Sequence, residues 1–108
     1  MIRHCVFIRF KPETPNETKA AIYVEIAALK TRLPGFLAAH LGDNVSPEAG
    51  MDKGYGEGFI VDFDGPAARD AYLADPEHQK TGGRIVDNAV GGLDGILVYD
   101  IEIADRNS

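Results

Sequence analysis

Apolar and polar residues alternate in four short segments of the chain, which is the pattern of half-buried β-strands. The predicted strands span residues 2–10, 36–45, 55–63 and 96–103. In the first strand one face is apolar apart from His4, and we expect the more apolar face of each strand to lie against helices. For the last strand the expected inward residues are Leu97, Tyr99, Ile101 and Ile103.

Helical spacing replaces alternation between the strands. From residue 14 to about 32, apolar residues recur three and four positions apart, and Thr14 to Glu17 form the pattern of a capping box. Residues 65–74 and 75–90 predict two further helices, the second one capped by Asp75 and starting with a proline. The glycines at 82 and 83 are poor helix formers, so we expect a kink or a closely approaching backbone there.

The order of these elements is β-α-β-β-α-β, with the second helical region in two pieces, which is typical of the ferredoxin-like fold. We therefore predict an α+β fold in one domain over residues 1–108, with the helices on one face of a four-stranded antiparallel sheet. The other face would have an apolar centre and a charged rim. We expect a second copy to bury it, giving a homodimer whose two sheets form a barrel; an open monomeric sheet is the alternative.

Composition and charge narrow the classes of partner. The net charge is −6 and the 11 basic residues are scattered, which argues against a nucleic-acid partner. No apolar run approaches the roughly 20 residues of a membrane span, so no membrane partner is expected. The one cysteine, Cys5, fits a reducing compartment, and we predict a cytoplasmic protein. No closely spaced ligand pair or phosphate-binding loop is present, so neither a metal nor a cofactor is predicted.

Four segments, taken in order and at their spacing, resemble the stress-responsive dimeric α/β-barrel (Dabb) domain family. They are "RHCVFIRFK" (3–11), "LGDNVSPE" (41–48), "GYGEGFIVDF" (54–63) and "AYLADPEHQ" (71–79). The resemblance extends over nearly the whole chain and implies a ferredoxin-like protomer in an obligate dimer. Many members of this family are stress-induced or uncharacterised proteins, so it implies a stress-responsive protein of unassigned activity.

A plant branch of the family implies a more specific alternative, a polyketide cyclase that works without metal or organic cofactor. In that branch a tyrosine and a histidine on the second helical region do the chemistry, and histidines from the strands line the pocket. By residue, Tyr72 and His78 match the helical pair and His4 matches the first-strand histidine. The third-strand histidine is replaced by Glu57 here, which is a departure from the cyclase pattern.

The chemistry of these four residues leaves two readings open. A tyrosine hydroxyl can donate to a developing oxyanion and a nearby histidine can take a proton, so Tyr72 and His78 are the candidate catalytic pair. His4 and Glu57 are candidate pocket residues, although both stand early in antiparallel strands and so lie toward opposite ends of the sheet. The first reading is a site for a small apolar oxygenated molecule between sheet and helices. The second is a non-catalytic dimer with a packed core and an ion-paired Glu57.

Overall fold

The computed structural model describes residues 1–104 and contains four strands and three α-helices in that range. The elements are β1 (Ile2–Ile8), α1 (Asn16–Ala28), β2 (Phe36–Asp43), β3 (Glu57–Phe63), α2 (Pro66–Ala74), α3 (Pro76–Asn88) and β4 (Ile96–Glu102). A short 3₁₀ turn, Leu29–Thr31, follows α1, and a second one, Gly92–Gly95, precedes β4.

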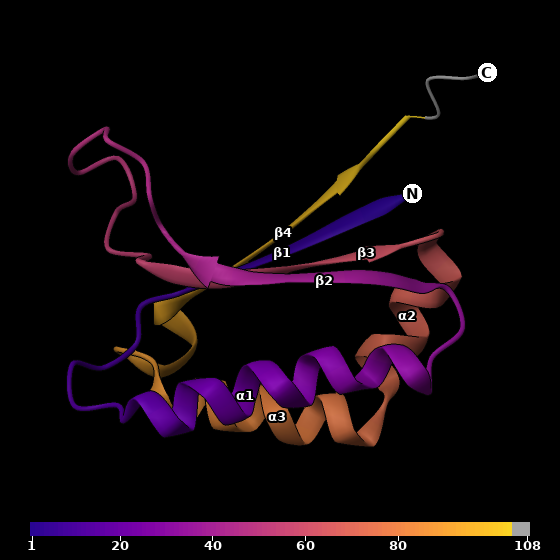
Figure 1. The fold of residues 1–108 in the computed structure, drawn as a ribbon, viewed down its shortest axis with the longest axis horizontal. Helices are drawn as coiled ribbons and strands as arrows, with labels where there is room; N and C mark the ends of the chain where they lie inside the picture. The colour runs from indigo at the N-terminus through magenta and orange to yellow at the C-terminus, as the bar shows by residue number, and fades with distance from the viewer. Residues whose placement is uncertain (105–108) are drawn as a thin grey trace.

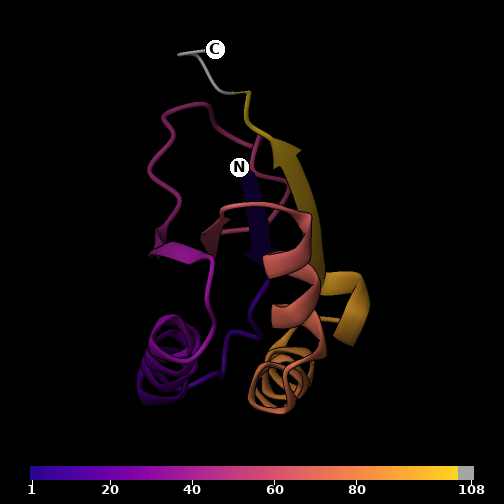
Figure 2. The same ribbon diagram turned by 90° about the vertical axis from the view of Figure 1, so that its right-hand side faces the viewer.

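The strands form one antiparallel sheet in the order β2-β3-β1-β4. The helices lie in a second layer on one face of this sheet, and α1 and α3 run side by side (Figures 1 and 2). The loop between β2 and β3 rises on the opposite side, away from the helices (Figure 1). The predicted α+β, ferredoxin-like arrangement is therefore confirmed.

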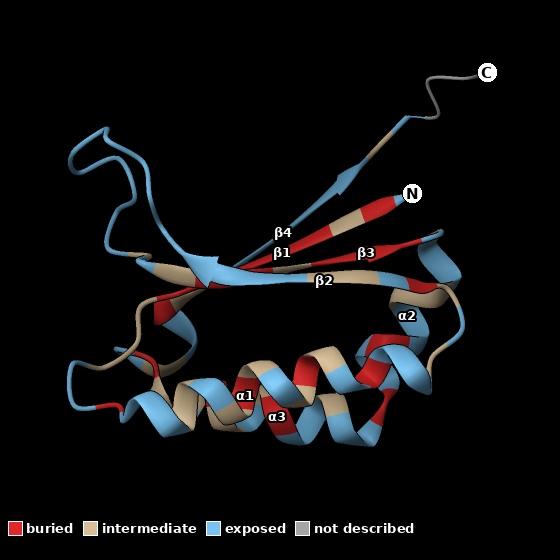
Figure 3. Cartoon of the chain, viewed as in Figure 1, coloured by how far each residue is buried: buried red, intermediate tan, exposed pale blue. Residues whose placement is uncertain are grey.

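The core lies between the two layers. The central strands β1 and β3 are mostly buried, whereas the edge strands β2 and β4 are largely exposed (Figure 3). The strands contribute aliphatic and aromatic side chains that meet apolar residues of all three helices. The largest fully buried side chains are Tyr72, Phe63, Ile8, Ile22, Ile26 and Val61.

The register of β4 reverses the predicted orientation of that strand. Residues directly opposite one another in an antiparallel pair point to the same face, and His4 lies opposite Asp100. Asp100 and Val98 therefore share the helix side with His4, whereas Leu97 and Tyr99 lie on the outer face. The prediction for β4 failed because the more apolar row, which includes Leu97, Tyr99 and Ile101, lies on the outer face, whereas the row on the helix side includes the charged Asp100 and Glu102.

Two local predictions about the helices are also wrong. Thr14 does not cap α1; Pro15 occupies the cap position without a side-chain hydrogen bond, and the Thr14 hydroxyl donates to the Asn88 carbonyl at 3.4 Å. Helix α3 continues without interruption through Gly82 and Gly83, and a Cβ at either would meet no atom of the described residues within 4 Å. These two glycines therefore do not accommodate a close contact within the protomer.

Candidate functional site

The junction between α2 and α3 places Tyr72 and His78 next to each other. In one continuous helix, residues six positions apart would point about 120° away from each other around the axis. Asp75 separates the two helices with an extended backbone, and its carboxylate accepts a hydrogen bond from the His78 backbone N–H at 3.0 Å. The Arg32 guanidinium holds the same carboxylate. As a result the Tyr72 and His78 rings have centroids only 4.0 Å apart.

The imidazole of His4 reaches the same place from the sheet. His4 lies in the central strand β1, is only 3% exposed, and has its ring centroid 5.7 Å from that of Tyr72. Its Nδ1 lies 2.6 Å from a carboxylate oxygen of Asp100. The structure thus brings together three of the four residues predicted for the site, and we call His4, Tyr72 and His78 the buried cluster.

Asp100 is a neighbour of this cluster that the sequence-based prediction missed. The alternation in β4 assigned it to the outer face. Only the pairing of β1 with β4, in which residue 4 lies opposite residue 100, reveals the contact. The signal was therefore a long-range strand register, which a local pattern does not contain.

Glu57 lies elsewhere on the helix side of the sheet. It pairs with Ile8 at the start of β3, whereas His4 pairs with Val61 four positions further along that strand. Its carboxylate accepts a hydrogen bond from the Lys19 ammonium at 2.7 Å, and its side chain is 23% exposed. Glu57 is therefore an ion-paired, partly hydrated carboxylate outside the buried cluster.

Burial keeps both helical residues of the cluster uncharged, which leaves Tyr72 with its proton and His78 without a second one. Burial raises the pKa of Tyr72, so its hydroxyl stays protonated across the physiological range. Burial lowers the pKa of His78, and this effect outweighs the Leu73 carbonyl and the Asp75 carboxylate, which raise it. At neutral pH the cluster therefore contains a proton donor beside an unprotonated imidazole.

The same two side chains present polar atoms without partners. Among the described residues, neither the Tyr72 hydroxyl nor Nδ1 of His78 has a hydrogen-bond partner, and both atoms are buried. A buried polar atom left unpaired costs about 1–3 kcal/mol, so native proteins rarely keep one without a reason. Two such atoms on adjacent rings mark this place as the candidate site.

The space around the cluster is closely packed. The Phe63 and Phe36 rings lie with their centroids 5.0 and 5.9 Å from that of Tyr72. A cavity of about 260 Å³ lies between α1 and α3 and is lined in part by Arg32 and Thr81, but neither Tyr72 nor His78 lines it. The cluster in this conformation is therefore a packed group of polar rings.

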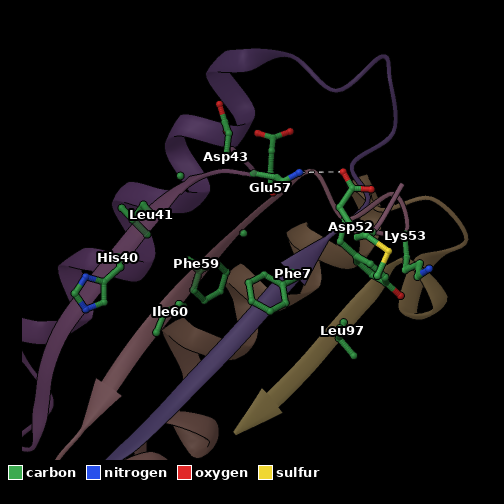
Figure 4. Close-up of a pocket in the computed structure, with 15 residues that line it drawn as sticks. Phe7, His40, Leu41, Asp43, Asp52, Lys53, Glu57, Phe59, Ile60 and Leu97 are labelled. Atoms are coloured by element: carbon green, nitrogen blue, oxygen red, sulfur yellow. Dashed lines mark hydrogen bonds between the residues drawn. The ribbon is translucent and has the colours of Figure 1, made fainter. Parts of the chain in front are cut away.

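A larger hollow of about 520 Å³ lies at the other end of the sheet, mainly on its outer face, and the predicted pocket residue Glu57 is among the residues that line it (Figure 4). Gly42 and Gly58 are paired across β2 and β3 and line this hollow; Gly42 is exposed, whereas Gly58 is buried. A side chain at Gly58 would collide with the Val6 carbonyl oxygen and with Phe7, whereas one at Gly42 would meet nothing within 4 Å among the described residues. Leu97 and the β2–β3 loop complete the walls. This hollow is mainly apolar and does not include the buried cluster.

Two negative findings apply to residues 1–104. No three histidine, cysteine, aspartate or glutamate side chains in that range gather closely enough to hold a metal ion. No helix in the described part of the chain has the length and apolar composition needed to cross a membrane.

The lowered pKa of His78 predicts a specific dependence of stability on pH. The unfolded state binds a proton near the ordinary histidine pKa of about 6.5, whereas the folded state binds it only at lower pH. The free energy of unfolding should therefore fall as pH drops from about 7 to about 5. The pKa values of Asp62, Asp75 and Asp100 are also lowered, because their hydrogen-bond and charge partners outweigh the effect of burial. These carboxylates affect the free energy of unfolding only at still lower pH.

Urea denaturation at several pH values measures this effect, with His78→Gln as the comparison. We expect the substitution to flatten the dependence between about pH 7 and 5, because glutamine does not titrate. An equally steep dependence in both proteins would contradict the assignment to His78.

The fold and the cluster together define a class: two-layer α+β proteins of ferredoxin-like fold with polar rings buried between sheet and helices. The model of the stress responsive A/B barrel domain family (Dabb) matches residues 2–103. The chain belongs to this family. No curated protein sequence matches it.

Solved structures agree with this assignment. A dimeric ferredoxin-like protein of unknown function from Jannaschia sp. CCS1 is 32% identical, with a TM-score of 0.88 over 94% of this chain and 98% of that one. A protein from Arabidopsis thaliana is 24% identical, with a TM-score of 0.83 over 97% of each chain. A hydroxynitrile lyase from Passiflora edulis is 17% identical, with a TM-score of 0.80 over 96% of this chain and 94% of that one. The last two similarities concern the fold alone.

Proposed function

We propose that the buried cluster binds a small, largely apolar, oxygenated molecule and moves a proton on it without a metal or organic cofactor. The observation that carries this proposal is that the Tyr72 and His78 rings lie with their centroids 4.0 Å apart, and that each carries a buried polar atom, the hydroxyl and Nδ1, without a partner among the described residues. A carbonyl compound supplies what these atoms lack, an acceptor for the hydroxyl and an acidic hydrogen for the imidazole.

The protonation states of Tyr72 and His78 at neutral pH are those that this chemistry requires. Tyr72, which stays protonated, donates a hydrogen bond to the carbonyl oxygen and stabilises the negative charge that develops there. His78, which is unprotonated at neutral pH, accepts a proton from the carbon beside the carbonyl and later returns it. The net reaction is an isomerisation, or the proton-transfer step of a lyase or cyclase reaction. A hydroxynitrile lyase of the same fold is compatible with acid–base chemistry on this scaffold.

The test is a thermal-shift screen with aldehydes, ketones and 1,3-diketones against the wild type, Tyr72→Phe and Tyr99→Phe. Tyr99 is 58% exposed on the outer face, so Tyr99→Phe is a matched control for the loss of a hydroxyl. We expect at least one compound to raise the Tm of the wild type and of Tyr99→Phe but not of Tyr72→Phe. A panel that stabilises none of the proteins, or all three equally, would refute the proposed site.

For any compound that binds, proton transfer is measured as deuterium exchange beside the carbonyl, followed by NMR. General base catalysis typically contributes 10²- to 10⁴-fold, so His78→Gln should slow the exchange by about that factor. Exchange that is equally fast with His78→Gln would remove the catalytic role of His78 while leaving binding intact.

A non-catalytic role is the second candidate, and a specific observation favours it. Phe36 and Phe63 pack on Tyr72, and neither of the two cavities described above is lined by the catalytic candidates. In this reading the protein is a stress-associated structural dimer. The failure of the ligand panel would support it.

We also propose that the protein is a homodimer formed through the outer face of the sheet. The side chains of Phe7, Ile60 and Leu97 lie there, and Leu97 is 42% exposed in the protomer. The Jannaschia relative, which is 32% identical, is dimeric. Two copies packed sheet to sheet would remove this apolar surface from water.

A further inference from the structure

The contact between β1 and β4 connects the buried cluster to two charged residues outside it. The Asp100 carboxylate receives His4 Nδ1 on one oxygen at 2.6 Å and the Arg69 guanidinium on the other at 3.0 Å. Arg69 also donates to Asp70 at 2.9 Å, so its guanidinium is held from two sides. The result is a chain of hydrogen bonds running Arg69–Asp100–His4.

This chain determines which nitrogen of His4 carries a proton. A carboxylate is only an acceptor, so the imidazole nitrogen facing it must be the protonated one. The pKa of Asp100 is lowered because the hydrogen bonds from His4 and Arg69 outweigh its burial, and the carboxylate therefore stays ionised at neutral pH. In neutral His4 the other nitrogen, Nε2, is then left with a free lone pair.

We propose that Asp100, held by Arg69, is a positioning residue that fixes a proton on His4 Nδ1, so that Nε2 of the neutral ring is the nitrogen left to accept a hydrogen bond from a bound molecule. The inference rests on the proposed function for its significance, because His4 belongs to the buried cluster with Tyr72 and His78. The acceptor is suited to a hydroxyl group on the bound molecule. The ligand class is thereby narrowed to compounds that carry a hydroxyl, or the enol form of a ketone, in addition to the carbonyl.

The geometry supports a fixed orientation of the ring. His4 is 3% exposed, and its ring lies edge-on to that of Tyr72, at an interplanar angle of 71°. Phe63 packs on the same imidazole with a centroid distance of 6.2 Å. Packing and the hydrogen bond therefore restrain the same rotation, which is the usual way in which a second residue orients a functional histidine.

The experiment is long-range ¹H–¹⁵N NMR of the imidazole rings at mildly alkaline pH, where the tautomer of each neutral histidine can be identified. The chain has three histidines, and single substitutions assign their signals. In the wild type we expect His4 in the Nδ1–H form, with a low-field Nδ1 proton. In Asp100→Asn we expect loss of the low-field proton and a shift toward the Nε2–H form, which free histidine prefers.

Asp62→Asn is the matched control. Asp62 is a carboxylate that contacts His40 at 3.0 Å on the outer face, so this substitution should change the His40 signals and leave those of His4 unchanged. The inference is overturned if wild-type His4 is in the Nε2–H form, or if Asp100→Asn leaves its tautomer unchanged. If Asp100→Asn does not fold, the wild-type spectrum still shows the tautomer of His4. Arg69→Gln then tests the role of the ion pair, because it should weaken the low-field Nδ1 proton signal.

A second readout separates this inference from the proposed function. A hydroxy-ketone that raises the Tm of the wild type should raise the Tm of Asp100→Asn by less. For the simple ketone analogue, the difference in Tm rise between the two proteins should be smaller. An equal loss for both compounds would remove the role of Nε2 as a hydroxyl acceptor. If no compound binds any variant, the proposed function fails, whereas the tautomer measurement still tests the role of Asp100.

Discussion

Leu97→Asp is expected to convert the proposed dimer into a monomer. Leu97 lies opposite Phe7 on the outer face, and both line the hollow there. A carboxylate buried at this position in both copies would cost at least about 3 kcal/mol, which corresponds to a dissociation constant raised by more than about a hundredfold. Sedimentation velocity at micromolar concentration measures the change.

Val98→Asp is the control for this prediction. Val98 is the next residue of β4 and is 56% exposed, but the register places it on the helix side of the sheet. A charge there should leave the dimer intact. If both variants remained dimeric, or if the wild type sedimented as a monomer, the proposed interface would be wrong.

Tyr72→Ala and Tyr72→Phe are expected to change stability in different directions. Tyr72 is completely buried and packs on Phe36, Phe63 and His78, so truncation to alanine should cost about 3–5 kcal/mol of unfolding free energy. Tyr72→Phe removes only a buried hydroxyl without a partner among the described residues. We expect it to be neutral or to stabilise the protein by up to about 1–3 kcal/mol.

Urea denaturation of the protein without ligand measures both effects. A gain in stability combined with a loss of ligand response in Tyr72→Phe would indicate that the hydroxyl is kept for function at a cost in stability. A loss of more than about 1 kcal/mol in Tyr72→Phe would instead indicate that the hydroxyl makes a stabilising hydrogen bond, which would contradict its unpaired state.

The order of elements was predictable because each element is specified locally. Alternation marks β1 and β3, and the Asp75-Pro76 pair marks the start of α3, where the aspartate side chain does accept the expected backbone hydrogen bond. The orientation of β4 was not predictable in this way. Its more apolar face lies on the outer side of the sheet, so apolar content indicates the wrong face, and only the pairing with β1 shows which one meets the helices.

The candidate site was predictable to a similar extent. Tyr72 and His78 were predicted together because they match the tyrosine and histidine that the resemblance to the cyclase branch implies, and the structure does bring their rings together. Glu57 and His4 share a face, as alternation indicates, but their separation along the strands prevents contact. Asp100 was missed because its contact with His4 joins residues 96 positions apart, which depends on the folded sheet.

The place of Asp100 in the sheet has a consequence for how the cluster behaves over time. It belongs to β4, an edge strand hydrogen-bonded on one side only, and edge strands are where local opening is least costly. When β4 opens locally, the imidazole of His4 loses its hydrogen bond to Asp100, although no residue of the buried cluster itself has moved. A contact that holds β4 in place, such as one with a neighbouring protomer, would therefore also stabilise the tautomer of His4.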